Sequence, residues 1–140
     1  MDSKEIGVEM TKYKQFIGVF PRDSLPKIYK KPCGLVINTD SAGEPGEHWV
    51  AIYLLSNGTG EYFDPFGLPP LHKDFAIFLY KHCPRWWCYS TAQLQDSVSV
   101  SCGKFSLEFL QNRFEGRSYK RFLQYFTTDT QKNDSVVKSL

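Results

Sequence analysis

The chain has 140 residues, of which 23% are charged and 16% are aromatic, and its formal net charge is +2. This length fits one domain with one core, and the aromatic content favours a globular domain over a disordered chain. The small net charge does not by itself indicate a nucleic-acid binder, and no apolar run is long enough to span a bilayer. Residues 1–6 are too polar for a secretory signal, so we expect reduced thiols at Cys33, Cys83, Cys88 and Cys102.

The first half of the chain has the patterns of a small sheet. Residues 1–13 fit either a short helix or a loose arm, and the apolar run 15–20 packs on the core without a clear strand or helix pattern. The segment 48–55 is apolar on both faces, as in a central strand. We expect strands at 34–39, 48–55 and 62–65, a loop at 41–47 and a hairpin turn at 56–60.

The second half is mostly helical. Phe75, Phe78 and Leu79 form the inner stripe of a helix over 71–82, and the aromatic run 85–90 predicts another strand. Further helices are expected at 102–114, at 118–126 and, within the terminal segment 127–140, at 134–140 with Asn133 as its N-cap. The pattern therefore predicts one α+β domain over residues 1–140, with a small sheet and helices around it.

Cys102 stands where a polar, serine-rich stretch gives way to an amphipathic helix. Ser101 is the N-cap candidate, which puts Cys102 in the first helical turn. Backbone N–H groups and the positive end of the helix dipole lower the pKa of a thiol there. The alternative is a buried structural cysteine, because free Cys is among the most buried residue types.

His48 and Asp64 stand near the ends of two strands that pair in the predicted hairpin. A hairpin centred on Ser56 places the two side chains opposite each other, where a carboxylate can hold an imidazole in one tautomer. A two-residue turn at Asn57 and Gly58 instead places Asp64 opposite Ala51. The sequence leaves both registers open, and a lone His is also commonly structural.

Gln95 completes a set of groups suited to thiol chemistry. Its side-chain amide is a suitable donor to an oxyanion, with the backbone N–H of Cys102 as the second donor, and Gln93 competes for the role. Gly103 lets a substrate approach without a Cβ in the way. A histidine, an acid, a glutamine and a cysteine in this order can form a site for acyl transfer.

Three segments resemble a known family of enzymes. Residues 46–51 read Gly-Glu-His-Trp-Val-Ala, residues 62–67 read Tyr-Phe-Asp-Pro-Phe-Gly, and Gln95 precedes Cys-Gly-Lys-Phe at 102–105. Together they resemble the adenovirus-type cysteine protease, adenain, and its relatives in polinton-like mobile elements, in the same clan as the SUMO-specific proteases. The resemblance implies a papain-like, adenain-like fold with the nucleophile at the N-terminus of a central helix.

The same resemblance implies roles for individual residues. Cys102 is then the nucleophile, His48 the general base, Asp64 its orienting acid and Gln95 part of the oxyanion hole. Trp49 and Gly103 would line the substrate groove beside the thiol. The chain departs from adenain at Asp64, where adenain has Glu, and from the SUMO-specific proteases at Ser101, where they usually have Asp.

The function implied is a cysteine endopeptidase that matures capsid precursors of a virus or mobile element at Gly-containing sites. The alternative within the fold is a protease that removes SUMO or another ubiquitin-like protein. A third hypothesis is a structural or metal-binding domain that uses His82, Cys83 and Cys88, with His72 or Cys33, although the spacing matches no standard zinc pattern.

For the protease we expect no cofactor or metal in the chemistry, a protein substrate, no membrane partner and a monomer. By resemblance DNA and an activating peptide are candidate activators, and Cys83 lies near, but not at, the position of the cysteine that links the peptide in adenain. Arg113, Arg117, Lys120 and Arg121 form a candidate DNA face, or simply a solvated one. The expected location is the host nucleus or cytoplasm, with packaging in the virion as a further option, and not the secreted fraction.

Overall fold

The computed structural model describes residues 3–40, 48–96 and 101–140. The predicted loop at 41–47 and the end of the serine-rich stretch at 97–100 lie outside these ranges. The elements in chain order are α1 (Ser3–Met10), β1 (Phe16–Pro21), β2 (Cys33–Asn38), β3 (Trp49–Leu54), β4 (Thr59–Phe63), α2 (Lys73–His82), β5 (Trp86–Tyr89), α3 (Cys102–Phe114), α4 (Tyr119–Leu123) and α5 (Thr130–Ser139).

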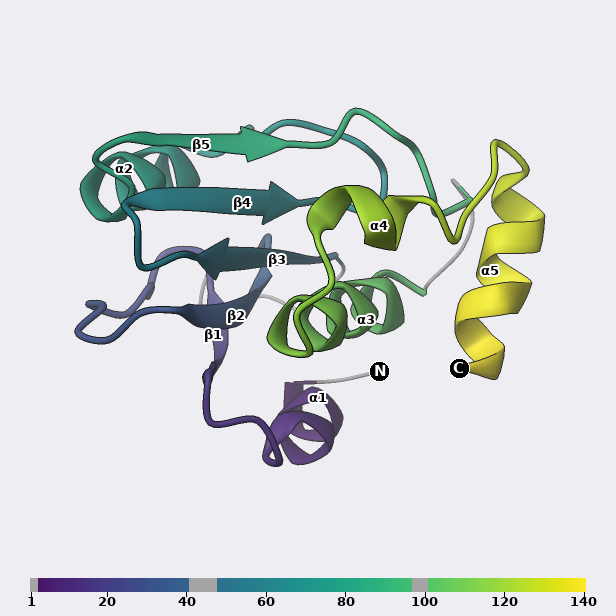
Figure 1. The fold of residues 1–140 in the computed structure, drawn as a ribbon, viewed down its shortest axis with the longest axis horizontal. Helices are drawn as coiled ribbons and strands as arrows, with labels where there is room; N and C mark the ends of the chain where they lie inside the picture. Colours follow the sequence, from purple (N-terminus) through teal and green to yellow (C-terminus); the bar gives the residue numbers. More distant parts are fainter. Residues whose placement is uncertain (1–2, 41–47, 97–100) are drawn as a thin grey trace.

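The five strands form one mixed sheet in the order β1-β2-β3-β4-β5 (Figure 1). The central strand β3 is antiparallel to both β2 and β4, whereas the outer strands β1 and β5 are parallel to their neighbours. Every residue of β3 is buried, because helices or coil cover both faces of the sheet. This agrees with the apolar pattern of 48–55 and explains why no polar alternation marks the strand.

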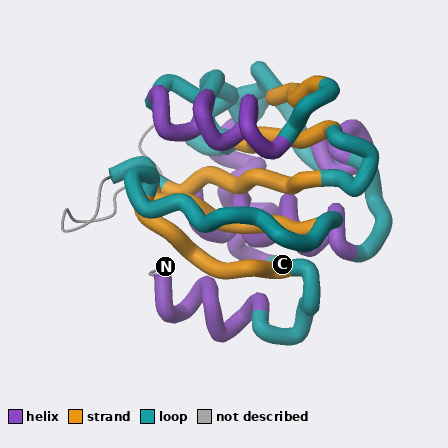
Figure 2. The backbone as a smooth tube through the Cα atoms, turned by 90° about the vertical axis from the view of Figure 1, so that its left-hand side faces the viewer, coloured by secondary structure: helices purple, strands orange, loops and turns teal. Residues whose placement is uncertain are grey.

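Each face of the sheet has its own core. Alternate residues of β3 (Trp49, Ala51 and Tyr53) pack with α1, α3, α4 and α5, and the intervening ones (Val50, Ile52 and Leu54) pack with α2 and the coil after β1. Figure 2 shows this coil crossing in front of the strands and helices behind them. The period-two alternation of β3 thus serves two cores, and α3 lies on the same face as Trp49.

The described part of the N-terminal segment, residues 3–13, is not a loose arm. It contains α1, whose Ile6 and Met10 are fully buried in the core on the α3 face. The apolar run that had no clear type is β1, which pairs in parallel with β2. A parallel partner is joined by a long crossover, so local sequence gives little indication of the pairing.

The last helix begins earlier than predicted, and Asn133 is not its N-cap. Asp129 caps α5, since its side chain accepts a hydrogen bond from the Lys132 N–H at 3.1 Å. Asn133 lies inside the helix and is 1% exposed. Its amide donates to the carbonyl oxygens of Leu94 at 3.1 Å and Thr127 at 2.7 Å, which ties α5 to the segment before α3. A buried asparagine with such partners resembles a capping residue in sequence.

The fold class agrees with the prediction of a small mixed sheet flanked by helices. Several elements differ from the predicted bounds. The helices α2 and α4 are shorter, since α2 begins at Lys73 and α4 ends at Leu123, and the edge strand β5 covers only Trp86–Tyr89. Strand β4 spans Thr59–Phe63 instead of 62–65, so it begins within the predicted turn. Within the described residues, no helix is long and apolar enough to cross a membrane.

Candidate active site

Cys102 is the first residue of α3, where the sequence placed it. Ser101 occupies the N-cap position, although its side chain makes no capping hydrogen bond. The cysteine is 4% exposed and belongs to the same core as Trp49. One turn further along α3, the Ser106 hydroxyl donates to the Trp49 carbonyl oxygen at 3.1 Å. This buried hydrogen bond fixes the N-terminal turn of α3 against the start of β3, next to His48.

His48 and Asp64 meet, but in neither of the two predicted registers. The observed pairs Leu54↔Gly60 and Ala51↔Phe63, continued by one residue, place Asp64 opposite Val50 rather than His48 or Ala51. His48 and Asp64 are therefore diagonal neighbours just beyond the ends of β3 and β4. Diagonal side chains still come within reach of each other, and His48 Nε2 lies 2.8 Å from Asp64 Oδ1.

A tight turn after β4 holds the Asp64 carboxylate in place. The Phe66 N–H donates to Asp64 Oδ1 at 2.8 Å, and the Gly67 N–H donates to the Asp64 carbonyl oxygen at 2.8 Å. Gly67 has a φ of +74°, a conformation that favours glycine. The Phe66 ring stacks on the His48 imidazole with a centroid distance of 4.7 Å. The turn therefore positions both the partner of the imidazole and the ring that covers it.

The electrostatics of the site favour a charged pair between His48 and Cys102. Burial lowers the pKa of His48, but hydrogen bonds to Asp64 and Cys102 outweigh it and raise that pKa to about 9. Burial alone would raise the pKa of the Cys102 thiol, but hydrogen bonds from His48 and from the Trp49 and Gly103 backbone lower it below its ordinary value. Since Asp64 engages Nε2, Nδ1 is the imidazole nitrogen left for the sulfur. Both shifts favour a thiolate beside an imidazolium over the neutral pair.

Gln95 lies next to this turn and Gln93 does not share its environment. The Pro65 carbonyl oxygen accepts the N–H of Leu94 at 2.9 Å and that of Gln95 at 3.0 Å, so the Gln95 backbone lies beside the residue that follows Asp64. Gln95 is fully buried, whereas Gln93 is exposed and donates its side-chain amide to the Gln95 carbonyl oxygen at 3.2 Å. Of the two glutamines, Gln95 is the one that the fold directs inward.

Trp49 and Gly103 contact the thiol through their backbones. Both peptide groups hydrogen-bond to the Cys102 sulfur, which the sequence did not indicate. The Trp49 side chain is 7% exposed and lies in the core, so its part in a groove wall stays a prediction. Ser106 and Phe66 are the site residues that sequence reasoning missed. A polar Ser106 between Phe105 and Leu107 on a buried helix was the available signal.

The far end of α3 is held by a buried ion pair, which removes one member of the proposed DNA face. The Arg113 guanidinium donates to both carboxylate oxygens of Glu61 on β4, at 2.7 and 3.1 Å, and lies 4.7 Å from the Tyr53 ring centroid. Arg117 pairs with Glu115 at 3.0 Å. The predicted face of four basic residues therefore keeps only Lys120 and Arg121 without a carboxylate partner among the described residues. Arg113 instead joins α3 to the sheet.

The other cysteines are thiols set apart from the site. Cys33 and Cys83 are buried on the α2 face, and Cys88 is exposed on the edge strand β5. Burial of Cys83 leaves it poorly placed for a disulfide to an activating peptide. Across residues 3–40, 48–96 and 101–140, no three His, Cys, Asp or Glu side chains gather closely enough to hold a metal ion. The metal-binding hypothesis therefore has no site in this part of the chain.

Comparison with known sequences points to one group of viral proteins. No family model matches the chain. A cysteine protease of African swine fever virus, from a Malawi tick isolate, is 30% identical over 117 residues, which are 74% of this chain and 42% of that protein. Counterparts from South African tick and Namibian warthog isolates, named SUMO-1 cysteine proteases, are 29% identical over the same length. The chain thus spans less than half the length of these relatives.

Solved structures agree with the sequence matches. A crystal structure of the African swine fever virus protease superposes with a TM-score of 0.57 and 27% identity, covering 79% of this chain and 46% of that chain. A second structure of that protease gives a TM-score of 0.60 at 22% identity, covering 96% and 63%. The central domain of a Legionella pneumophila protein gives 0.58 at 16% identity and shares the fold. These matches confirm the fold class and show homology to the viral cysteine protease.

Replacing Gly67 with alanine tests the link between the turn and the site. A Cβ at Gly67 would lie 2.6 Å from the Thr91 carbonyl oxygen, in addition to the strain of a positive φ. We expect Gly67→Ala to lower the free energy of unfolding by about 2–3 kcal/mol. It should also slow the reaction of Cys102 with iodoacetamide, because the turn that holds Asp64 moves. Urea unfolding and mass spectrometry of the Cys102 peptide measure the two effects.

Gly116→Ala is the matched control. Gly116 also has a positive φ, +91°, but nothing lies within 4 Å of its added Cβ. This variant should lose only about 1 kcal/mol of stability and keep the reactivity of Cys102 unchanged. Equal effects of the two substitutions on Cys102 would show that the Gly67 turn does not position the site.

Proposed function

We propose that this chain is a cysteine endopeptidase in which Cys102, His48 and Asp64 form the catalytic triad. The observation that carries the proposal is the 2.8 Å contact of His48 Nε2 with Asp64, made while the same imidazole is hydrogen-bonded to Cys102 at the start of α3. Homology to a viral cysteine protease supports it independently. A structural cysteine would need neither the imidazole nor the carboxylate behind it.

The reaction follows from these groups. The Cys102 thiolate attacks the carbonyl carbon of the scissile peptide, and the electron pair of the C=O bond moves to the oxygen. His48 gives its Nδ1 proton to the departing amine as the C–N bond breaks, which leaves a thioester on Cys102. Water then attacks the thioester and loses a proton to His48, and the C–S bond breaks to release the acid. Asp64 keeps the proton on Nε2 and orients the ring throughout.

The oxyanion formed in each step needs donors. The backbone N–H of Cys102 stands at the first position of α3, where N–H groups point out of the helix end. We assign the second donor to the Gln95 side-chain amide, because Gln95 is buried and its backbone is bonded to the residue after Asp64. Removing one such donor typically costs a hundredfold or more, on the order of 10²–10³, in kcat.

For the substrate we favour capsid precursors of a virus or mobile element, cleaved at Gly-containing sites. The support is the resemblance of residues 46–51, 62–67 and 95–105 to adenain-type proteases, together with viral homologues. On the same ground the enzyme acts in the host nucleus or cytoplasm or inside the particle. DNA and an activating peptide remain candidate activators, although the pairing of Arg113 and the burial of Cys83 give them little support.

A second candidate function is removal of a ubiquitin-like protein from its conjugates. It is favoured by two relatives that are named SUMO-1 cysteine protease, and by Asp64, which is the acid found in SUMO-specific proteases. Both functions use the same triad and differ only in whether the enzyme recognises a short peptide segment or a folded ubiquitin-like protein.

Replacing Cys102 with alanine tests the enzyme assignment. With a fluorogenic peptide that ends in Gly-Gly as substrate, Cys102→Ala should lower kcat/KM by at least about a thousandfold, because the nucleophile is lost. Circular dichroism should show an unchanged fold. The control is Cys88→Ala, which removes an exposed thiol on β5 and should retain wild-type activity. Persistent activity in Cys102→Ala would contradict the proposal.

Probes with a C-terminal electrophile distinguish the two substrate classes. The probes are SUMO-1, ubiquitin and a short peptide that share a Gly-Gly end and the same reactive group. If capsid maturation is the function, all three should label Cys102 at similar rates, since only the last residues are recognised. Labelling by SUMO-1 more than about tenfold faster than by the short peptide would instead assign the chain to deconjugation.

A further inference from the structure

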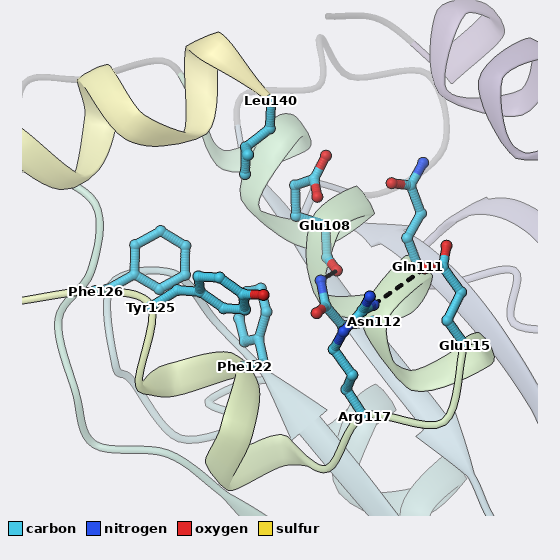
Figure 3. Close-up of a pocket in the computed structure, with 9 residues that line it drawn as sticks. All are labelled: Glu108, Gln111, Asn112, Glu115, Arg117, Phe122, Tyr125, Phe126 and Leu140. Atoms are coloured by element: carbon cyan, nitrogen blue, oxygen red, sulfur yellow. Dashed lines mark hydrogen bonds and ion pairs between the residues drawn. The ribbon is translucent and has the colours of Figure 1, made fainter.

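A cavity of about 240 Å³ lies along the C-terminal half of α3, away from the thiol. Asn112 is ten residues after Cys102 on the same helix, which corresponds to roughly 15 Å at the helical rise. Figure 3 shows the α3 side chains on one side of the cavity and aromatic rings on the other. The lining residues are Glu108, Gln111, Asn112, Glu115, Arg117, Phe122, Tyr125, Phe126 and Leu140.

Asn112 brings an unsatisfied acceptor to this cavity. The residue is 8% exposed, and its side-chain nitrogen donates to the Glu108 carbonyl oxygen at 2.7 Å. Among the residues that the structure describes, its Oδ1 accepts no hydrogen bond. A buried acceptor without a donor is costly, so such atoms usually receive a hydrogen bond from a ligand or water. The cavity is several times larger than one water molecule.

The charges around the cavity favour a positive ligand. The side chain of Glu108 is 12% exposed and pairs with Lys104 at 3.5 Å, while Glu9 and Glu115 add further negative charge close by. Burial raises the pKa of Glu108, and Lys104 opposes this only in part. The one guanidinium on the rim, that of Arg117, is paired with Glu115 at 3.0 Å. An anion would meet the oxygens of Asn112 and Glu108, whereas a cation would find two acceptors.

The opposite wall suits an alkyl chain that ends in such a cation. Phe122, Tyr125 and Phe126 line it (Figure 3), and the Phe122 and Phe126 rings meet edge to face with 5.3 Å between their centroids. Aromatic faces attract cations as well as methylene groups. Tyr125 is 61% exposed, so the wall can be reached from solvent.

We propose that this cavity binds the basic side chain, arginine or lysine, of a partner peptide. The cationic group donates to Asn112 Oδ1 and the Glu108 carboxylate, and its methylene groups lie against Tyr125 and Phe126. The site is separate from the proposed triad, and binding there does not depend on catalysis. In a protease it would hold a polypeptide about five extended residues from the scissile bond.

N-acetyl-arginine amide is the probe, and N-acetyl-citrulline amide, its neutral isostere, is the ligand control. In ¹⁵N-labelled wild-type protein, the arginine amide should shift the side-chain amide signals of Asn112 and Gln111 saturably. Citrulline should bind at least about tenfold more weakly, because it lacks the charge that the acceptors favour. Equal shifts from both ligands, or no saturable shift, would overturn the proposal.

Asn112→Leu removes the acceptor without changing the size of the side chain much. It should weaken binding of the arginine amide by about tenfold or more, yet keep or raise the melting temperature, because an unsatisfied buried group is removed. Glu108→Gln should also weaken binding and serves as the second variant if Asn112→Leu fails to fold. Asp23→Asn makes the same charge change on an exposed residue after β1 and should leave binding unchanged. Wild-type affinity in both cavity variants would overturn the proposal.

Discussion

One imidazole is shared between two acidic groups, and the chemistry of the site depends on that sharing. His48 contacts Asp64 through Nε2 and is hydrogen-bonded to Cys102. In this position the ring gains affinity for a proton while the thiol loses it, so both charged forms are favoured despite burial. Neither shift would arise from the helix N-terminus alone, because burial by itself opposes ionisation of Cys102.

The fold maintains this arrangement by fixing α3 at both ends. Near its start, the Ser106 hydroxyl bonds the Trp49 carbonyl oxygen at 3.1 Å, and near its end Arg113 binds Glu61 with two hydrogen bonds. On the other side of the imidazole, the Gly67 turn holds Asp64. The first two contacts join α3 to the central strands β3 and β4, and the third closes the turn that follows β4. Cys102 therefore stands at the start of a fixed helix, and His48 and Asp64 lie just beyond the ends of two central strands, which limits the movement of these groups.

Much of the site could be predicted from sequence because its signals are local. The buried strand β3, the amphipathic helix α3 and the position of Cys102 in its first turn all follow from hydrophobic periodicity. The hairpin register did not follow from periodicity, because it depends on the connection at residues 55–58, where Asn57 Oδ1 accepts the Thr59 N–H and Gly58 has a positive φ. The parallel pairing of β1, the interior place of Asn133 and the pairing of Arg113 depend on residues far away in the chain. Local sequence patterns do not indicate contacts between residues that are distant in the chain.

The rate of Cys102 alkylation by iodoacetamide, followed by mass spectrometry from pH 4 to 10, tests the charged pair most directly. In the wild-type protein the rate should already be on a plateau at pH values below the ordinary thiol pKa, and it should fall in acid as the thiolate is protonated. It should change a second time near pH 9, where His48 loses its proton. In His48→Ala the midpoint should move up by at least about one pH unit, because the imidazolium no longer favours the thiolate. Exposed Cys88, whose pKa is raised by burial of part of its surface, is the internal control. A single midpoint near the ordinary thiol value, the same in both proteins, would contradict the account.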